Sequence, residues 1–246
     1  MQMRVKNQKH LSSNLALTIH SSRRRFAARL NSGVSTHMNN VAFFLRNKLA
    51  ENKFSDAVMA ALNMPEVDSA LLCSGFFQED SSYSISAAKF SGISRCGHRL
   101  DLTTVGYYKG GKVSYSDFTK GISSHCCSVC INHTPLRLPG DKWHAKVFIG
   151  KSQGAPIVAA IGSSNLTRRA FDTIKNFNYE CDVLFWDESH RSISSRVSAL
   201  LGEAPDESLS IVVAKVDQTH PVNRVPVSEK LKQLEREIRA KAVVVA

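Results

Sequence analysis

The first fifty residues contain no aspartate and no glutamate, although nine of them are lysine or arginine. The positive net charge of the 246-residue chain, +11, is therefore concentrated near its N-terminal end. No apolar run approaches the roughly 18 residues that cross a bilayer, so a membrane span is not expected. Six cysteines are too few and too unevenly spread for a disulfide scaffold. A reducing compartment, the cytoplasm, is therefore expected.

Residues 1–37 form a basic arm that includes Arg23, Arg24, Arg25 and Arg29. Such a segment can bind a polyanion, because each cation that neutralises a phosphate releases a condensed counterion. It can equally be a solvated, inert tail. Its arginine- and serine-rich composition, free of acids, also fits an organellar targeting peptide. The four arginines are candidate contacts to nucleic acid under the first interpretation.

Strand and helix patterns alternate through the rest of the chain. Apolar, β-branched or aromatic runs predict strands at residues 70–77, 100–106, 143–149, 156–161 and 180–186. Apolar residues at helical spacing or helix-capping residues predict helices at 38–49, 54–64, 167–174 and 192–201. Residues 109–140 show no clear period. The alternation predicts an α/β fold with a mixed sheet flanked by helices.

The polar residues that can carry chemistry follow these strands. In His144-Ala145-Lys146-Val147, strand alternation sends His144 and Lys146 to one face, so that both point into one site. The next strand ends in Gly162-Ser163-Ser164-Asn165, which brings Ser163 and Asn165 beside that pair. Glu180 opens the last strong strand. These five polar side chains predict a single site.

The combination of His144-x-Lys146 with Gly162-Ser163-x-Asn165 resembles the signature of the phospholipase D superfamily, and Glu180 matches the downstream acid of its nuclease-like members. The resemblance runs from about residue 70 to 186, and it is closest to members with one signature copy per chain, which include bacterial nucleases and restriction endonucleases. One departure is Lys151, which stands where the signature has aspartate. The connection from Lys146 to Gly162 is also longer than usual in the family.

The resemblance implies a phospholipase D-like catalytic domain at residues 38–202. It would lie between the basic arm and a C-terminal extension, residues 203–246, with a candidate edge strand at 209–216. The extension ends in a helix that Ser228 can cap. The apolar stripe of this helix, Leu231, Leu234 and Ile238, indicates core packing or, alternatively, a dimer contact.

The chemistry implied by the resemblance is hydrolysis of a phosphodiester without a metal or other cofactor. His144 would attack phosphorus and form a phosphohistidine, while Lys146, Ser163 and Asn165 bind the phosphate oxygens. Glu180 would orient the imidazole. A second histidine has to protonate the leaving oxygen, and with one motif per chain it would come from a homodimer partner.

Nucleic acid is the expected substrate and partner, because the basic arm can follow a phosphate backbone. The resemblance leaves open whether that is DNA or RNA. A phospholipid phosphodiesterase is the alternative enzyme, although no amphipathic segment flanks the site. A catalytically silent homologue that binds nucleic acid is the alternative outside catalysis.

A separate cluster offers soft metal ligands. Cys127, Cys130 and His133 have a spacing that zinc can use, with Cys96, His98 or His125 as a candidate fourth ligand. The same thiols can equally be small side chains that fill a loop.

Overall fold

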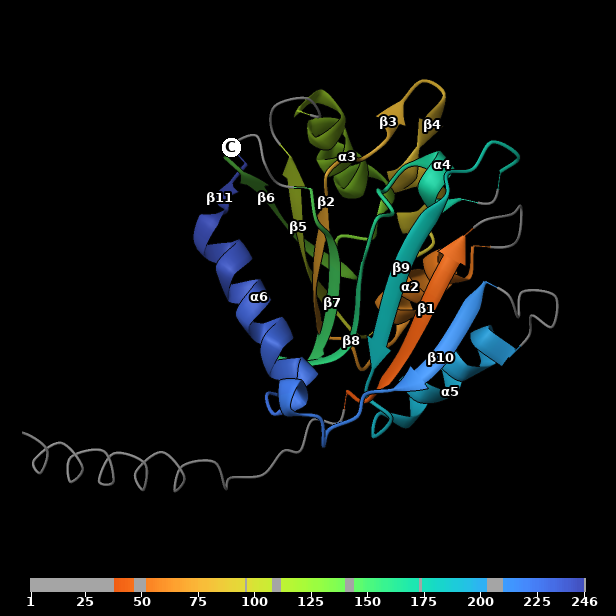
Figure 1. Ribbon diagram of the computed structural model, residues 1–246. Coiled ribbons are helices and arrows are strands. Elements are labelled where there is room, and N and C mark those ends of the chain that lie inside the picture. The colour runs from red at the N-terminus through yellow and green to blue at the C-terminus, as the bar shows by residue number, and fades with distance from the viewer. Residues whose placement is uncertain are drawn as a thin grey trace, which may run out of the picture. The chain divides into compact units, whose positions relative to one another are not determined.

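A nine-stranded mixed sheet is the centre of the fold (Figure 1). The computed structural model describes residues 38–46, 52–95, 97–107, 112–139, 144–172, 174–202 and 210–245. The strand order is β10-β1-β9-β8-β7-β2-β5-β6-β11, in which β2, β5 and β6 are parallel neighbours and all other pairs are antiparallel. The α/β fold with a mixed sheet flanked by helices is thereby confirmed.

The bounds of the elements follow the chain. The strands of the main sheet are β1 (Asn40–Arg46), β2 (Ser69–Ser74), β5 (Leu100–Tyr107), β6 (Ile131–Leu138), β7 (Lys146–Ser152), β8 (Ala155–Gly162), β9 (Glu180–Trp186), β10 (Ile211–Lys215) and β11 (Val243–Val244). The helices are α2 (Lys53–Asn63), η2 (Ser86–Phe90), α3 (Lys112–His125), α4 (Arg168–Phe171), α5 (Arg191–Gly202), η4 (Pro221–Asn223) and α6 (Val227–Lys241). Strands β3 (Glu79–Asp80) and β4 (Tyr83–Ser84) form a small hairpin. Among the described residues, no helix is long and apolar enough to span a membrane.

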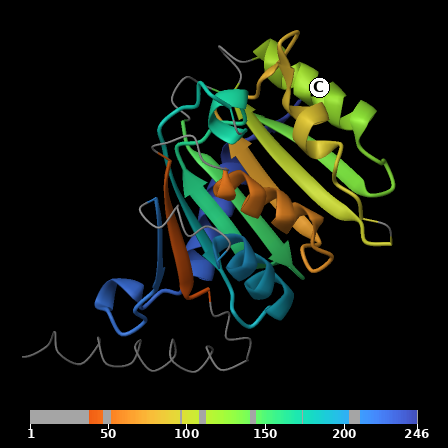
Figure 2. The same cartoon turned by 90° about the vertical axis from the view of Figure 1, so that its right-hand side faces the viewer.

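Helices cover both faces of the sheet and create two apolar cores. Helices α2, α3 and α5 lie on one face, and α6 lies on the other (Figures 1 and 2). The larger core takes alternate residues of each strand, such as Leu72, Phe148 and Leu184, while the smaller core takes the intervening ones, such as Leu71 and Ile149. The two-residue period of the strands therefore decides which face each side chain serves.

The sequence-based helix at residues 38–49 is wrong. Residues 40–46 form β1, which pairs with β9 on one side and with β10 on the other. The run is a short continuous apolar segment, and periodicity alone does not distinguish a buried strand from a helix in such a segment. Three apolar side chains of β1 are buried: Val41, Ala42 and Phe44. Pairing of the strand with neighbours on both of its edges therefore outweighs the helical spacing of its apolar residues.

The other predicted elements lie close to their expected positions. In α2, the side chain of Asn52 accepts a hydrogen bond from Ser55 N, and the helix ends before Pro65. Thr167 caps α4 by accepting from Ala170 N. The strand expected from residue 143 begins at Lys146, so His144 lies two residues before it. The unassigned stretch 109–140 contains α3, whose many serines obscure its periodicity, and β6.

The C-terminal residues complete the same sheet. Within 210–245, β10 and β11 form its two edges, and α6 packs across β8 through Leu231 and Ile238. The apolar stripe of α6 therefore contributes to the core. The predicted cap is wrong, because α6 begins after Pro226 without a side-chain cap, and Ser228 is buried inside the first turn. The described residues between 38 and 245 belong to one compact unit.

Lys151, near the end of β7, pairs with this C-terminal helix. Its Nζ lies 2.7 Å from Glu235 Oε1, which also accepts from Arg239 Nε at 2.8 Å. Burial alone would raise the pKa of Glu235, but the hydrogen bonds and charges of Lys151 and Arg239 hold that pKa below its ordinary value. Lys151 is thus a structural residue near the end of β7 opposite to Lys146.

We expect Lys151→Met to lower the free energy of unfolding by about 2 kcal/mol, less than for an isolated buried pair because Arg239 still contacts Glu235. Lys215→Met is the matched control, since its pair with Glu188 is largely exposed and should contribute nothing measurable. Urea unfolding measures both. Because the folded pKa of Glu235 is lowered, the pair stabilises above the ordinary glutamate pKa of about 4.3. The difference from wild type should therefore shrink as the pH falls through the folded value.

Candidate active site

The predicted site residues gather at one end of the sheet. Ser74 ends β2, Lys146 begins β7 and Gly162 ends β8, so three neighbouring strands meet there. Lys146 has the same strand parity as Phe148, and Glu180 has the same parity as Leu184, so both face the side of the larger core. The antiparallel register of β7 and β8, which pairs Lys146 with Gly162, brings the two halves of the motif together.

His144 and Lys146 are in direct contact. Lys146 Nζ lies 2.9 Å from His144 Nδ1 and donates to the carbonyl oxygen of His144 at 2.7 Å. Lys146 is buried, and His144 is exposed. The same Nζ also lies 3.4 Å from Nε2, so the ammonium group is close to both nitrogens of the ring. The lysine therefore holds the position of the imidazole.

Gly75 marks the point where the site residues converge. A Cβ at this position would lie 3.3 Å from Asn165 Oδ1 and 3.9 Å from both His144 Cδ2 and Lys146 Nζ. Asn165 Oδ1 accepts a hydrogen bond from Phe76 N at 3.1 Å and lies 3.3 Å from Ser74 Oγ. With its oxygen engaged in this way, the amide can donate through its NH₂ group to an oxygen of a ligand.

Ser163 and Glu180 form the second half of the site. Ser163 Oγ donates to Glu180 Oε2 and accepts from Cys181 N at 2.9 Å. Glu180 Oε1 accepts from Asn178 Nδ2 at 3.2 Å. Glu180 was expected to orient the imidazole, but its hydrogen bonds hold Ser163 and Asn178. The hydrogen bonds of the His144 ring go to Lys146.

Asp182 is a buried acid that the sequence interpretation missed. Its carboxylate accepts from Ser164 Oγ at 2.6 Å and from Ser164 N at 3.1 Å, which holds the loop after β8. Burial raises its pKa, against the opposing effect of the Ser164 hydrogen bonds. A Cβ at Gly162 would overlap Asp182 Oδ1, so only glycine fits there. The two-residue spacing from Glu180 along β9 was a usable signal for Asp182.

Arg46 was also missed, because the helix assigned to its segment was wrong. It ends β1 opposite Glu180. Its guanidinium donates to the carbonyl oxygens of Arg169 at 3.0 Å and Asp172 at 2.6 Å and lies 5.1 Å from the ring centre of Phe177. Arg46 therefore ties the turn of α4 and the segment before β9 to the sheet.

Burial and two nearby carboxylates have opposite effects on the pKa of Lys146. Burial lowers the pKa of Lys146, while the negative charges of Glu180 and Asp182 oppose that effect. A cation partly removed from water interacts more strongly with an arriving anion than an exposed lysine does. The buried ammonium of Lys146 and the NH₂ group of Asn165 supply donors beside the imidazole for the oxygens of a tetrahedral phosphate group.

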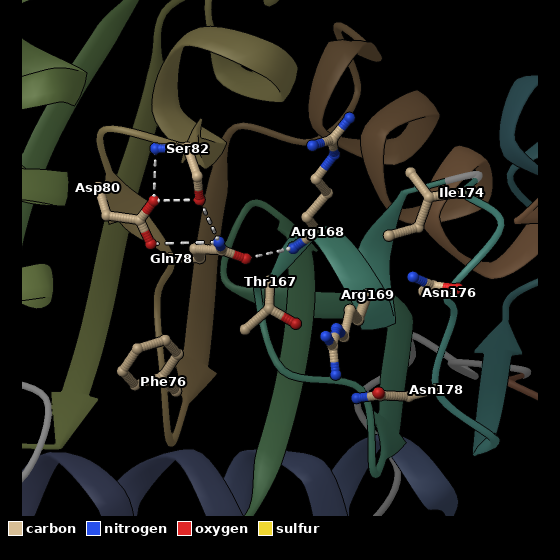
Figure 3. Close-up of a pocket in the computed structure, with 10 residues that line it drawn as sticks. All are labelled: Phe76, Gln78, Asp80, Ser82, Thr167, Arg168, Arg169, Ile174, Asn176 and Asn178. Atoms are coloured by element: carbon tan, nitrogen blue, oxygen red, sulfur yellow. Dashed lines mark hydrogen bonds between the residues drawn. The ribbon is translucent and has the colours of Figure 1, made fainter.

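A cleft lies next to these residues, and Figure 3 shows the side chains that line it. Its volume is about 580 Å³. Its lining residues come from the segment after β2, from α4 and from the segment before β9: Phe76, Gln78, Asp80, Ser82, Thr167, Arg168, Arg169, Ile174, Asn176 and Asn178. Two of these lining residues contact the candidate site: Phe76 N donates to Asn165, and Asn178 Nδ2 donates to Glu180. The cleft therefore opens beside the catalytic candidates.

The candidate zinc ligands serve other contacts. His133 is bonded to Thr104 Oγ1 at 2.7 Å, and burial lowers its pKa to about 4. A hydrogen bond with Cys130 lowers the pKa of the exposed Cys127. Within the described ranges, no group of three or more histidine, cysteine, aspartate or glutamate side chains is placed to hold a metal. Cys96 and the arm arginines Arg23, Arg24, Arg25 and Arg29 lie outside the described residues.

The chain is similar to several solved structures at low sequence identity, whereas no family model and no curated protein sequence matches it. Similar structures are polyphosphate kinase from Porphyromonas gingivalis (14% identity, TM-score 0.37), yeast tyrosyl-DNA phosphodiesterase (12%, 0.34) and phosphatidylserine synthase from Haemophilus influenzae Rd KW20 (13%, 0.40). The matches cover 69%, 59% and 82% of this chain. They span 27%, 31% and 46% of the three proteins, respectively, so the chain corresponds to less than half of each.

Proposed function

We propose that the chain is a metal-independent phosphodiesterase of the phospholipase D superfamily and that it cleaves nucleic acid. The observation that carries the proposal is the convergence of His144, Lys146 and Asn165 around Gly75, with Ser163 and Glu180 beside them. A phosphodiester resists attack because it is anionic, and this set supplies a nucleophile together with a cation and hydrogen-bond donors for its oxygens.

The reaction begins when the phosphodiester displaces Lys146 from the ring. A charged phosphate oxygen is a stronger acceptor for the ammonium than Nδ1 of His144 is. The released imidazole then attacks phosphorus through a nitrogen lone pair, and the bond from phosphorus to the leaving oxygen breaks. Lys146 and the NH₂ group of Asn165 stabilise the extra negative charge on the nonbridging oxygens. Glu180 keeps Ser163 in position and maintains the charge of Lys146.

The leaving oxygen needs a proton, and water must later be deprotonated to hydrolyse the phosphohistidine. A second imidazole performs both tasks, giving its proton to the leaving group and taking one from water. In a homodimer, the same histidine of the other subunit lies across the two-fold axis and completes the site.

The direct test uses purified full-length protein in EDTA. Plasmid DNA, an RNA of similar length, bis(p-nitrophenyl) phosphate and phosphatidylcholine vesicles are incubated in parallel, and the products are quantified. Cleavage of nucleic acid and of the small diester supports the proposal. Release of choline without cleavage of nucleic acid would instead establish a phospholipid phosphodiesterase. No product from any of the four would indicate a silent homologue.

The basic arm is proposed to hold the polymer through Arg23, Arg24, Arg25 and Arg29. We expect deletion of residues 1–37 to weaken binding to long DNA and to flatten the dependence of log K on log salt by about 0.9 for each phosphate that the arm neutralises. Hydrolysis of bis(p-nitrophenyl) phosphate should persist, because it has a single phosphodiester. Filter binding at several salt concentrations measures the slope, and an unchanged slope would identify the arm as an inert tail.

A further inference from the structure

The cleft beside the site combines an aromatic platform with cationic and amide groups. The side chain of Phe76 is 39% exposed although it is fully apolar. Its backbone is fixed on both sides, because Phe76 N donates to Asn165 Oδ1 at 3.1 Å and Phe76 O accepts from Ser74 Oγ at 2.7 Å. A ring that is exposed and rigidly placed next to the reaction centre is suited to stack on a flat group of the substrate.

The opposite wall supplies charge. Arg168 and Arg169 are adjacent in α4 but point in opposite directions, and Arg169 lies beside Asn178 in the cleft (Figure 3). The guanidinium of Arg168 is instead 5.7 Å from the ring centre of Tyr83. Asn178 in turn donates to Glu180 at 3.2 Å, so this wall also ends at the catalytic candidates. Arg169 is therefore the arginine placed to meet a phosphate next to the site.

Hydrogen bonds connect the two walls at the far end of the cleft. Gln78 Oε1 accepts from Arg168 N at 3.0 Å, while Gln78 Nε2 donates to Asp80 Oδ2 at 3.2 Å. Asp80 also accepts from Ser82 N at 2.8 Å. These contacts join the segment after β2 to α4 across the cleft. The carboxylate of Asp80 would repel an anionic group of a ligand from this wall.

We propose that this cleft binds an unpaired nucleotide next to the scissile phosphate, so that the preferred substrate is single-stranded nucleic acid. Phe76 stacks on the base, and Arg169 contacts the neighbouring phosphate. The reason is geometric: both faces of a base are covered by its neighbours in a duplex, and only an unpaired base offers a face to an aromatic side chain. The inference rests on the proposed phosphodiesterase function and adds the form of its substrate.

The test measures binding without cleavage. The full chain carrying His144→Ala is titrated in EDTA into a labelled short oligothymidylate and into a labelled duplex, with fluorescence anisotropy as the readout. We expect Phe76→Leu to weaken single-strand binding about tenfold, the size of one base–aromatic stack. Phe76→Trp should retain binding. Phe43→Leu is the matched control, because Phe43 is equally exposed, at 39%, but lies on β1 outside the cleft.

The arginines provide a second readout. Arg169→Gln should reduce the slope of log K against log salt for the single strand by about 0.7, whereas Arg168→Gln should leave the slope nearly unchanged. Equal affinity for single strand and duplex, or a change below about threefold in Phe76→Leu, would overturn the assignment of the cleft. Tighter binding to phosphatidylglycerol vesicles than to the single strand would also overturn it, in favour of a lipid headgroup.

Failure of the cleft assignment and failure of the proposed function are separable. Wild-type protein is assayed with bis(p-nitrophenyl) phosphate in EDTA, which reports the chemistry without a base. Hydrolysis of this diester together with equal affinity for the single strand and the duplex would refute the cleft assignment alone. A single-strand preference that depends on Phe76, without any hydrolysis, would refute the phosphodiesterase and leave the cleft as a binding site.

Discussion

Replacing His144 with alanine should abolish phosphodiester cleavage, with a fall in rate of about 10⁴-fold or more. The same residue is the nucleophile in one subunit and the acid in the other, so one substitution removes both functions. Initial rates with bis(p-nitrophenyl) phosphate and nicking of supercoiled plasmid, both in EDTA, give the measurement. The imidazole is exposed, so the variant should fold and retain its unfolding midpoint.

His98→Ala is the matched control for this experiment. His98 is also exposed, and it precedes β5 at the end of the sheet away from Ser74. Its replacement should leave both rates unchanged. If the His144→Ala protein kept more than about a tenth of wild-type activity, an imidazole nucleophile at this position would be ruled out. Parallel loss of activity in the His98→Ala protein would point to general destabilisation instead.

Mixing wild-type and His144→Ala chains should give heterodimers with almost no turnover. The double displacement needs two imidazoles, the chain offers one in the motif, and a two-fold axis supplies the second. A shared site in the heterodimer then holds only one histidine. Differently tagged chains are co-expressed, and the doubly tagged species is isolated. Its rate is compared with those of both homodimers prepared in the same way.

The level of activity in the heterodimer discriminates between two arrangements. Half of the wild-type rate would show that each chain carries a complete site, and a second acid would have to be found within the chain. His133 does not suit that role, because burial lowers its pKa to about 4 and Thr104 holds its ring. His125, exposed at the end of α3, would then be the first histidine to replace.

The position of four candidate residues at or next to the ends of two paired strands made their grouping predictable. His144 and Lys146 follow a two-residue period, and Ser163 and Asn165 leave the end of the next strand, so local geometry brings the four to one end of the sheet. The role of Glu180 was not predictable in this way. Its hydrogen-bond partners, Ser163 and Asn178, depend on how a loop returns to the sheet, and no local pattern encodes that path.

Hydrophobic periodicity and motif spacing are local properties, so the α/β class, most of the strands and the grouping of the candidate site residues at one end of the sheet could be predicted from the amino-acid sequence. The strand at residues 40–46 could not, since it depends on pairing with both β9 and β10, which overrides helical spacing. The buried position of Asp182, the anchoring role of Arg46 and the pairing of Lys151 with Glu235 likewise emerged from the folded chain alone. Each of these depends on contacts between residues distant in the chain, where burial and electrostatics, and not local preference, determine the result.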